Sequence, residues 1–353
     1  MSEENFISDE ELVKRKLEHL ILCSTDKVAF KQKTTGFELY DFVHCAVPPI
    51  DIDEINLNAD FFGFNSNYPF FISCMTGGTS DLTNINLQLA EAASELNIPL
   101  GLGSQRYALG SEEFYSHFEK IKETACDVPI IGNIGAAQIA EGKYFTQILK
   151  LIEYSGVNAF AIHLNPAQEL FQVKGDTNFE NFYKNLEDLV EKANVPFIAK
   201  EVGSGISAPV IKNLLDCGVE GIDVAGAGGT SWTAVEILRN GEPEDQEFWD
   251  WGLPTVYCIN QAIKIKVQRD FMLTGSGGIN TAFDIAKALA LGCDFTASAR
   301  IILRALNESG TQGVINFVNR LFKDVKRIMY LTGATSLTDF NTSKLIKKEE
   351  FYK

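Results

Sequence analysis

The sequence predicts an α/β protein, a (β/α)8 TIM barrel, and three observations favour that fold. Eight short apolar runs rich in β-forming residues alternate with segments of helical periodicity. The runs are continuously apolar, which is typical of buried parallel strands joined by crossover helices. Glycine and polar residues directly follow the runs, at the positions from which βα loops build a barrel's active site. A doubly wound sheet more often has about six strands, so the eight predicted strands favour the barrel.

The predicted strands follow one another along the chain, each ahead of a helical or loop segment. They are PFFISCM from Pro69, IPLGLG from Ile98, VPIIGNIG from Val128, AFAIHLN from Ala159, VPFIAKEV from Val195, GIDVAG from Gly221, FMLTGSG from Phe271 and FTASAR from Phe295. Amphipathic periodicity predicts helices over NINLQLAEAASELN, EEFYSHFEKIKETA, YFTQILKLIEYSG, FENFYKNLEDLVEKAN, APVIKNLLDCG and TAFDIAKALALGC.

Two further parts flank or interrupt this repeat. We assign residues 1–65 to an N-terminal extension that contributes substrate-binding residues, 66–335 to the barrel and 336–353 to a C-terminal tail. The long connection from Trp232 to Phe271 is acidic and aromatic, with NGEPEDQEFWDWG at its centre. We expect this insertion to be a lid or an oligomer contact, and a plain surface excursion is the alternative.

The composition limits the kinds of partner. The 353 residues carry a formal net charge of -16, which disfavours a nucleic-acid backbone or an anionic membrane surface. Seven cysteines without a C-x-x-C pair and only four histidines argue against a disulfide framework and a Cys–His zinc site. No signal core follows the N-terminal charges, and no apolar run approaches the ~20 residues that cross a bilayer. We expect a soluble cytoplasmic protein.

The stretch RKLEHLILCS lies ahead of the first predicted strand and gathers three possible cations, Arg15, Lys16 and His19. In an acidic protein an anionic ligand must be met locally, and guanidinium and ammonium groups are suited to phosphate oxygens. The alternative is a solvated helix face balanced by nearby glutamates.

Two glycine-rich loops are candidate phosphate sites. GSGGI, from Gly275, follows the penultimate strand, and SARI, from Ser298, follows the last one, where barrels commonly bind phosphate; turn chemistry alone is the alternative. GSGISA also satisfies G-x-G-x-x-A, with Asp223 at the spacing of a ribose-binding acid. A dinucleotide fingerprint normally follows the first strand, however, and this one follows the fifth, so we interpret its glycines as turn residues.

Polar side chains at two strand ends suggest a reactive rim. Lys200 ends the run PFIAK and should meet a carboxylate or an anionic ligand; Glu201 is adjacent but faces the other way on a strand. His163 and Asn165 share a strand face, with Gln168 and Glu169 just beyond. A single carboxylate suits Mg²⁺ that is also held by substrate phosphates and water, whereas a capped loop with a satisfied core histidine is the alternative.

In their order along the chain, nine motifs resemble the type 2 isopentenyl-diphosphate isomerases, FMN-dependent enzymes built on a (β/α)8 barrel. They span about Arg15 to Arg300 and read RKLEH, MTGG, GLGSQR, NIGAAQ, HLNPAQE, GDTNF, KEVGSGIS, DVAGAGGTSW and GSGGI. The chain departs from that pattern at Val173 and Lys174, where proline and an acid are expected, and at Cys74, where alanine is common. Cys74 lies where it would affect the flavin environment.

The resemblance implies reduced FMN, Mg²⁺ and NADPH as reductant, with interconversion of isopentenyl and dimethylallyl diphosphate in isoprenoid biosynthesis. It implies that FMN contacts Met75, Thr76, Ser104, Asn133, Lys200, Thr230, Gly277, Gly278, Ala299 and Arg300. It implies that substrate contacts Arg15, Lys16, His19, Ser104, Gln105, Arg106 and Gln168, and that Glu169 binds the metal. We assign Gln168, His163 and Asn165 to the catalytic set and expect a homo-oligomer, either a tetramer or an octamer.

A 1,3-proton transfer in an unactivated alkene adds a proton at one carbon and removes one from another, and ordinary carboxylic acids protonate such alkenes poorly. In the family that the chain resembles, reduced flavin is thought to act as acid and base near N5. The resemblance puts Lys200 beside the anionic pyrimidine side of the flavin and leaves Gln168 to orient substrate or flavin.

Two alternatives belong to other functional classes. A flavin barrel oxidoreductase, of the 2-hydroxy-acid oxidase or dihydroorotate dehydrogenase type, would be expected to place a histidine base late in the barrel, yet no histidine follows His163. A noncatalytic barrel that binds a phosphorylated ligand would not need polar side chains at so many strand ends. A yellow colour in the purified protein would distinguish the flavin enzymes from the second alternative.

Overall fold

Eight parallel strands close into a barrel, in the order β4-β5-β6-β7-β8-β9-β10-β11, so the predicted (β/α)8 fold is confirmed. The computed structural model describes residues 9–75, 80–110, 115–351 and 353. The barrel strands, each inside one of the eight predicted runs, are β4 (Phe70–Ile72), β5 (Leu100–Gly101), β6 (Ile130–Gly135), β7 (Ala159–Leu164), β8 (Phe197–Glu201), β9 (Gly221–Asp223), β10 (Met272–Gly275) and β11 (Phe295–Ser298).

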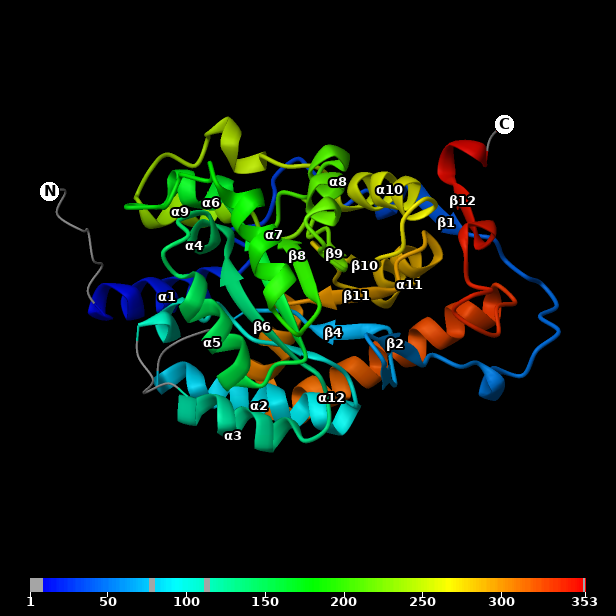
Figure 1. Cartoon of the computed structure of the whole chain (residues 1–353). Helices are drawn as coiled ribbons and strands as arrows, with labels where there is room; N and C mark the ends of the chain where they lie inside the picture. Colours follow the sequence, from blue (N-terminus) through cyan, green and yellow to red (C-terminus); the bar gives the residue numbers. More distant parts are fainter. Residues whose placement is uncertain (1–8, 76–79, 111–114, 352) are drawn as a thin grey trace, which may run out of the picture.

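Helices surround the barrel because each parallel strand returns through a crossover (Figure 1). The longer ones are α2 (Ser80–Leu96), α3 (Tyr115–Ala125), α5 (Phe145–Ser155), α7 (Phe182–Lys192), α8 (Ala208–Asp216), α10 (Thr255–Lys266), α11 (Ala282–Ala290) and α12 (Arg300–Leu331). Three shorter ones follow strand ends, namely α4 (Ala136–Ala140), α6 (Pro166–Phe171) and α9 (Trp232–Arg239). Among the described residues, no helix combines the length and the apolar character that crossing a bilayer requires.

The strand register brings the polar strand ends together. His163 on β7 pairs with Lys200 on β8, and Lys200 pairs with Asp223 on β9. Because these strands are parallel, their carboxyl ends meet at one rim, and three chemically distinct side chains become neighbours there. The rim is therefore fixed by the sheet rather than by flexible loops.

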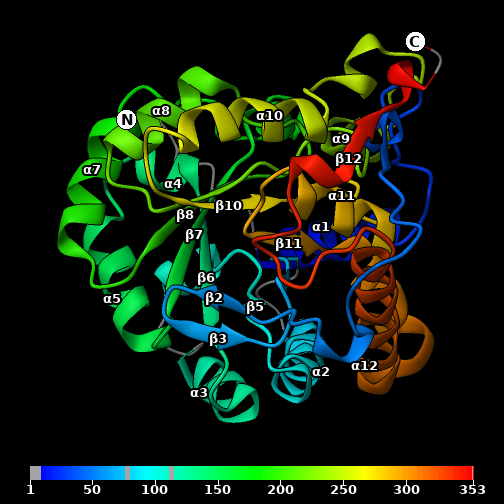
Figure 2. The ribbon, with the colours of Figure 1, turned by 90° about the vertical axis from the view of Figure 1, so that its right-hand side faces the viewer.

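Segments outside the repeat cover the two ends of the barrel. The hairpin β2 (Ala59–Phe61) and β3 (Phe64–Ser66) lies at the near end in Figure 2, where Phe61 packs edge-on against Phe71 and Phe295 of the barrel interior. The helix α1 (Asp9–Cys23) lies at the far end (Figure 2). In addition, β1 (Tyr40–Phe42) pairs antiparallel with β12 (Leu345–Lys347) and joins the extension to the tail. The hairpin thus closes the amino-terminal side of the barrel, and α1 covers the opposite side (Figure 2).

The connection from Trp232 to Phe271 is not irregular throughout, in contrast to the sequence interpretation. It begins with α9 and ends with α10, and only residues 240–254 between them are irregular apart from a 3-10 helix at Glu247–Asp250. Periodicity did not reveal α9 because the helix has only 8 residues, fewer than the roughly 11–18 over which a helical period is recognised. The irregular part is tied to the chain after α1, since Asp250 accepts hydrogen bonds from the backbone N–H groups of Lys31 and Gln32.

Candidate active site

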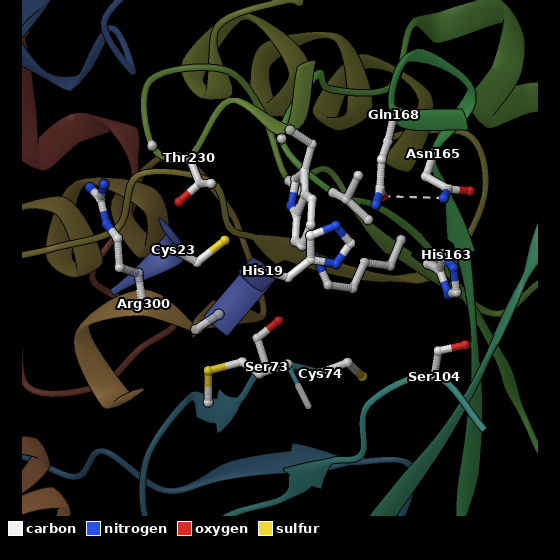
Figure 3. A pocket seen from close by; sticks show the side chains of 18 of the residues that line it. His19, Cys23, Ser73, Cys74, Ser104, His163, Asn165, Gln168, Thr230 and Arg300 are labelled. Atoms are coloured by element: carbon white, nitrogen blue, oxygen red, sulfur yellow. Dashed lines mark hydrogen bonds between the residues drawn. The ribbon is translucent and has the colours of Figure 1, made fainter. Parts of the chain in front are cut away.

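A cavity of about 280 Å³ opens at the carboxyl ends of the barrel strands, beneath α1. Residues of α1 line one wall, and strand ends and βα loops line the others (Figure 3). In this view His19 projects from α1 between Thr230 and Arg300 on one side and His163, Asn165 and Gln168 on the other. An extension element thus completes a site whose floor is the barrel.

Two contacts between α1 and α9 hold α1 over the cavity. His19 Nε2 lies 2.8 Å from Glu236 Oε1 on α9, and Arg239 Nε donates to Glu18 Oε2 at 3.0 Å. The RKLEH stretch is therefore not a fully solvated helix face: Arg15, Lys16 and His19 line the cavity, while Leu17 between them is exposed. A lone polar helix would not remain docked, so these anchors are needed to keep its cations in place.

The α1 cations lie in an unfavourable environment before any ligand binds. Burial, together with the charge of the neighbouring Arg15, lowers the pKa of Lys16 to about 7. Burial and the Arg106 charge likewise lower the pKa of Arg15, while Glu169 partly offsets them. The Lys16 ammonium lies 4.8 Å above the ring of Tyr107, a favourable cation–π geometry. This part of the cavity is suited to a multiply charged anion.

Glu236 is a functional carboxylate that sequence reasoning missed. It is fully buried on α9 and touches His19, Arg239 and Gln168, the last through Nε2 at 3.4 Å. Burial raises the pKa of Glu236, but the hydrogen bond and charge of His19, together with Arg239, lower it on balance. The signal in the sequence was a glutamate in the apolar stretch TAVEIL, four residues after Trp232 and therefore on the same helix face.

A neutral hydrogen-bonded layer lies below the cavity. His163 Nδ1 donates to Asn133 Oδ1 at 2.8 Å, and the Asn133 backbone N–H donates to Gln105 Oε1 at 2.9 Å. Burial, followed by the charges of Lys200 and Arg106, lowers the pKa of His163 to about 4. The imidazole is therefore neutral near pH 7, which is suited to hydrogen bonding and not to acting as an acid.

Asn165, Gln168 and Glu169 form a second polar cluster at the end of β7 and the start of α6. Asn165 Nδ2 donates to Gln168 Oε1 at 3.2 Å and to Glu169 Oε1 at 2.9 Å, while Asn165 Oδ1 has no hydrogen-bond partner among the described residues. Burial raises the pKa of Glu169, and the hydrogen bonds from the Asp176 backbone and Asn165 oppose the rise.

These oxygen donors fit a hard cation only in part. Glu169 offers a carboxylate and Asn165 an unpartnered amide oxygen, which are ligand types that Mg²⁺ prefers. Within the described part of the chain, no three His, Cys, Asp or Glu side chains group closely enough to hold a metal by themselves. A metal here would need oxygens from its ligand or from water.

Lys200 is held at the centre of the rim by an acid other than Glu201. Its Nζ lies 3.6 Å from Asp223 Oδ2 and donates to the backbone oxygen of Glu201 at 2.8 Å, while Ser276 Oγ donates to Asp223 Oδ1. Burial raises the pKa of Cys74 to about 12 despite the nearby Lys200 charge, so this thiol is a neutral neighbour.

The Glu201 carboxylate binds backbone N–H groups of the GSGISA loop, which matches a dinucleotide fingerprint in sequence. Glu201 Oε2 accepts hydrogen bonds from the backbone N–H groups of residues 202–205 at 2.5 to 3.2 Å. Burial raises the pKa of Glu201 to about 7, and these hydrogen bonds limit the rise. Because an internal carboxylate already uses these donors, the GSGISA loop cannot cradle a pyrophosphate, and the turn interpretation of its glycines is preferred.

The loops after β10 and β11 are available for a phosphate. Gly277 and Gly278 have φ of 90° and 72°, and a Cβ at Gly277 would lie 2.2 Å from the Gly226 carbonyl oxygen, so the backbone itself forms this wall. Arg300 begins α12, and its buried Nη1 lies 3.7 Å from Asp26 Oδ1 but makes no hydrogen bond within the described residues. A buried guanidinium nitrogen that still lacks a hydrogen bond, beside glycine backbone and a helix N-terminus, fits the phosphate of FMN.

Most of the residues predicted for the site line this one cavity. They are Arg15, Lys16, His19, Met75, Ser104, Arg106, Asn133, His163, Asn165, Gln168, Glu169, Lys200, Thr230, Gly277, Gly278, Ala299 and Arg300. Gln105 is instead fully buried beneath the cavity, where it bonds Asn133, and Thr76 lies outside the described residues.

Comparisons with known proteins agree with this geometry. Residues 140–347 match the family model described as FMN-dependent dehydrogenase. The chain is 39% identical over 350 residues to the isopentenyl-diphosphate delta-isomerase of Chlorobium phaeobacteroides, covering 95% of this chain and 96% of that protein. It is 40% identical over 328 residues to the enzyme of the same name from Vibrio parahaemolyticus, covering 92% and 96%.

Solved structures show the same fold in distant proteins. The flavin-binding domain of baker's yeast flavocytochrome b2 aligns with a TM-score of 0.70 at 18% identity, covering 96% of this chain and 91% of that domain. A mandelate oxidase mutant aligns with a TM-score of 0.66 at 17% identity, covering 98% and 99%. At these identities the likeness concerns the fold alone.

Proposed function

The chain belongs to the isopentenyl-diphosphate delta-isomerases, a family of enzymes, and from that premise we propose that it interconverts isopentenyl and dimethylallyl diphosphate by 1,3-proton transfer. We infer that it uses reduced FMN and Mg²⁺ and acts in isoprenoid biosynthesis. The observation that carries this proposal is that one cavity offers two separate sites for anions. The glycine loop with Arg300 suits a cofactor phosphate, and the α1 cations with Arg106 suit a second phosphorylated ligand.

FMN, supported by the match to the FMN-dependent family, would lie along the barrel rim. Arg300 and the backbone near Gly277 and Gly278 would hold its phosphate, and Lys200 would provide the cation next to an anionic flavin ring. Reduced FMN would supply acid–base chemistry for adding a proton to one alkene carbon and removing a proton from another carbon. Asn133, tied to His163, would present its side chain beneath the same cofactor.

The substrate diphosphate would be held from two directions. Arg15 and Lys16 approach it from α1, and Arg106 approaches it from the barrel, so the charge-assisted contacts lie on both sides of the ligand. Glu169 would supply the protein's carboxylate to Mg²⁺, with substrate oxygens as further ligands. Gln168, which bonds both Asn165 and Glu236, would orient the alkene, and α1 would exclude water from it.

The oxidoreductase alternative shares the fold and the flavin. A 2-hydroxy-acid oxidase needs a base to remove the hydroxyl proton of its substrate. The last histidine of this chain is His163, and burial and nearby cations lower its pKa to about 4. That value leaves a poor base, already engaged with Asn133. The isomerase is therefore preferred.

We further propose a reducing, cytoplasmic setting with NADPH as the flavin's reductant, and a tetramer or an octamer. All seven cysteines are free, which is typical of a reducing compartment. The negative formal charge of -16 supports the expectation of neither nucleic-acid nor membrane partners.

An anaerobic assay tests the proposal. The enzyme is incubated with isopentenyl diphosphate, FMN and Mg²⁺, with or without NADPH or dithionite, and the allylic product is measured by its acid lability. We expect turnover only after flavin reduction, with far less NADPH consumed than product formed. NADPH oxidised one-for-one with product, or full activity with oxidised FMN, would refute the proposal.

A further inference from the structure

The second residue of the GDTNF motif, Asp176, contacts both Arg106, a proposed substrate-binding cation, and Glu169, the proposed metal ligand. Asp176 Oδ2 accepts a hydrogen bond from Arg106 Nη1 at 2.7 Å, and Gln138 Nε2 donates to the same oxygen at 3.3 Å. The backbone N–H of Asp176 donates to Glu169 Oε2 at 2.9 Å. One residue thus contacts Arg106 through its side chain and Glu169 through its main chain.

The loop that carries Asp176 is fixed against α6. Gly175 N–H donates to the Gln172 carbonyl at 2.9 Å, and Lys174 has a positive φ of 57°, as a tight turn requires. A Cβ at Gly175 would lie only 1.9 Å from the Glu169 carbonyl oxygen. The position of the Asp176 N–H therefore follows from the packing of the loop and does not depend on its own carboxylate.

Arg106 and Glu169 would attract each other if no other group intervened. The Arg106 charge already acts on Glu169, since it is among the influences that lower the pKa of this carboxyl against the effect of burial. A guanidinium paired directly with Glu169 would cover the oxygens that a cation needs, and it would no longer point at a diphosphate. The Asp176 carboxylate binds the guanidinium at 2.7 Å instead.

We propose that Asp176 is a positioning residue that keeps Arg106 away from Glu169, so that a Mg²⁺–diphosphate chelate can enter between the two. Its carboxylate restrains the arginine, while its backbone N–H orients the metal-binding carboxylate. This inference rests on the proposed function, and it assigns to the motif a role that neither Arg106 nor Glu169 performs alone.

The test is a double-mutant cycle with the FMN-loaded enzyme. Asp176→Asn preserves size and the backbone N–H but weakens the hold on Arg106, which is then free to pair with Glu169. We expect the Mg²⁺ concentration for half-maximal activity to rise about tenfold, a loss in line with one charge-assisted contact, and the substrate KM to rise with it. In an Arg106→Gln background the arginine that Asp176 restrains is absent, so adding Asp176→Asn should leave the Mg²⁺ requirement unchanged.

Three further variants separate this role from a structural one. Gly175→Ala displaces the loop itself and should raise the Mg²⁺ requirement in both backgrounds. Asp176→Glu retains a carboxylate and should recover part of the parent's Mg²⁺ response. Asp188→Asn, the same chemical change on an exposed position of α7, should resemble the parent throughout.

Binding of Mn²⁺ in the presence of inorganic pyrophosphate, followed by electron paramagnetic resonance, gives a readout that does not depend on turnover. The inference is wrong if Asp176→Asn weakens Mn²⁺–pyrophosphate binding by the same factor in the parent and in the Arg106→Gln background. It is also wrong if Asp176→Asn has no effect on this binding in the parent. If the expected pattern is found in a parent protein that does not isomerise isopentenyl diphosphate, the proposed function fails while the inference stands.

Discussion

The environment of Lys16 makes substrate binding depend on pH in a way that can be calculated. Burial and the adjacent Arg15 lower the pKa of Lys16 to about 7, so its protonated fraction falls from about nine-tenths at pH 6 to about one-tenth at pH 8. A bound diphosphate favours the ammonium and raises this pKa, so binding takes up a proton above pH 7. The affinity for substrate should therefore be full below pH 7 and should fall about tenfold by pH 8, or about 1.4 kcal/mol.

Steady-state kinetics and calorimetry with pyrophosphate, at pH values between 6 and 8, would measure this effect. Lys16→Met retains the stem but not the charge, and should show a high KM at pH 6 with little further rise. Lys16→Arg remains charged throughout, and should show a low KM that is nearly flat with pH. Other groups that titrate in this range, including Glu201 and the substrate itself, are common to all three proteins. An equal pH slope in the parent and in Lys16→Met would refute the reasoning.

Three further changes test separate parts of the site. Glu169→Gln should raise the Mg²⁺ requirement about tenfold with FMN retention and thermal melt unchanged, and a Mg²⁺ titration like the parent's would mean that the metal binds elsewhere. Arg15→Ala combined with Lys16→Ala should raise KM by about a hundredfold, with the flavin spectrum of the parent, whereas unchanged kinetics would leave the diphosphate to Arg106 and the metal. Glu201→Ala removes the acceptor of the N–H groups of residues 202–204, of which that of Gly203 is buried, and should lower the free energy of unfolding by about 3 kcal/mol in urea, unlike the exposed Glu187→Ala.

The barrel could be predicted because its signal is local. Each strand is a short apolar run, and the polar residues that follow the strands must meet at one rim once the strands are parallel. The sequence alone therefore places His163 and Lys200 at the same rim, and in the structure they are paired. The partners of those residues could not be predicted. Asp223 lies one strand beyond Lys200, and only the closed sheet determines that their side chains face each other.

Helix α9 shows what local sequence patterns cannot predict. It has only 8 residues, too few for a clear helical period, so both the helix and Glu236 within it were missed, although Glu236 anchors α1 through His19. A buried glutamate in an apolar stretch is informative only when its partners are known, and His19 is 217 positions away in the sequence. Long-range pairs of this kind depend on the docking of α1, which local patterns do not encode.

The distribution of charge explains how a protein with a net charge of -16 can bind a diphosphate. The barrel's cavity cations have carboxylate neighbours, Asp223 for Lys200 and Asp176 for Arg106, so they add little positive potential until a ligand competes for them. On α1, burial and neighbouring cations lower the pKa of both Arg15 and Lys16. Arg106 acts on Arg15 and Arg15 acts on Lys16, while the charges of Glu169 and Glu236 oppose the fall for Arg15. Repulsion between cations therefore acts on α1, and the hydrogen bond of His19 with Glu236 and the ion pair of Glu18 with Arg239 keep the helix docked. On the proposed function, a diphosphate that enters beneath α1 would offset this repulsion and strengthen the docking of the helix, so that binding of the anion and covering of the alkene would be one event.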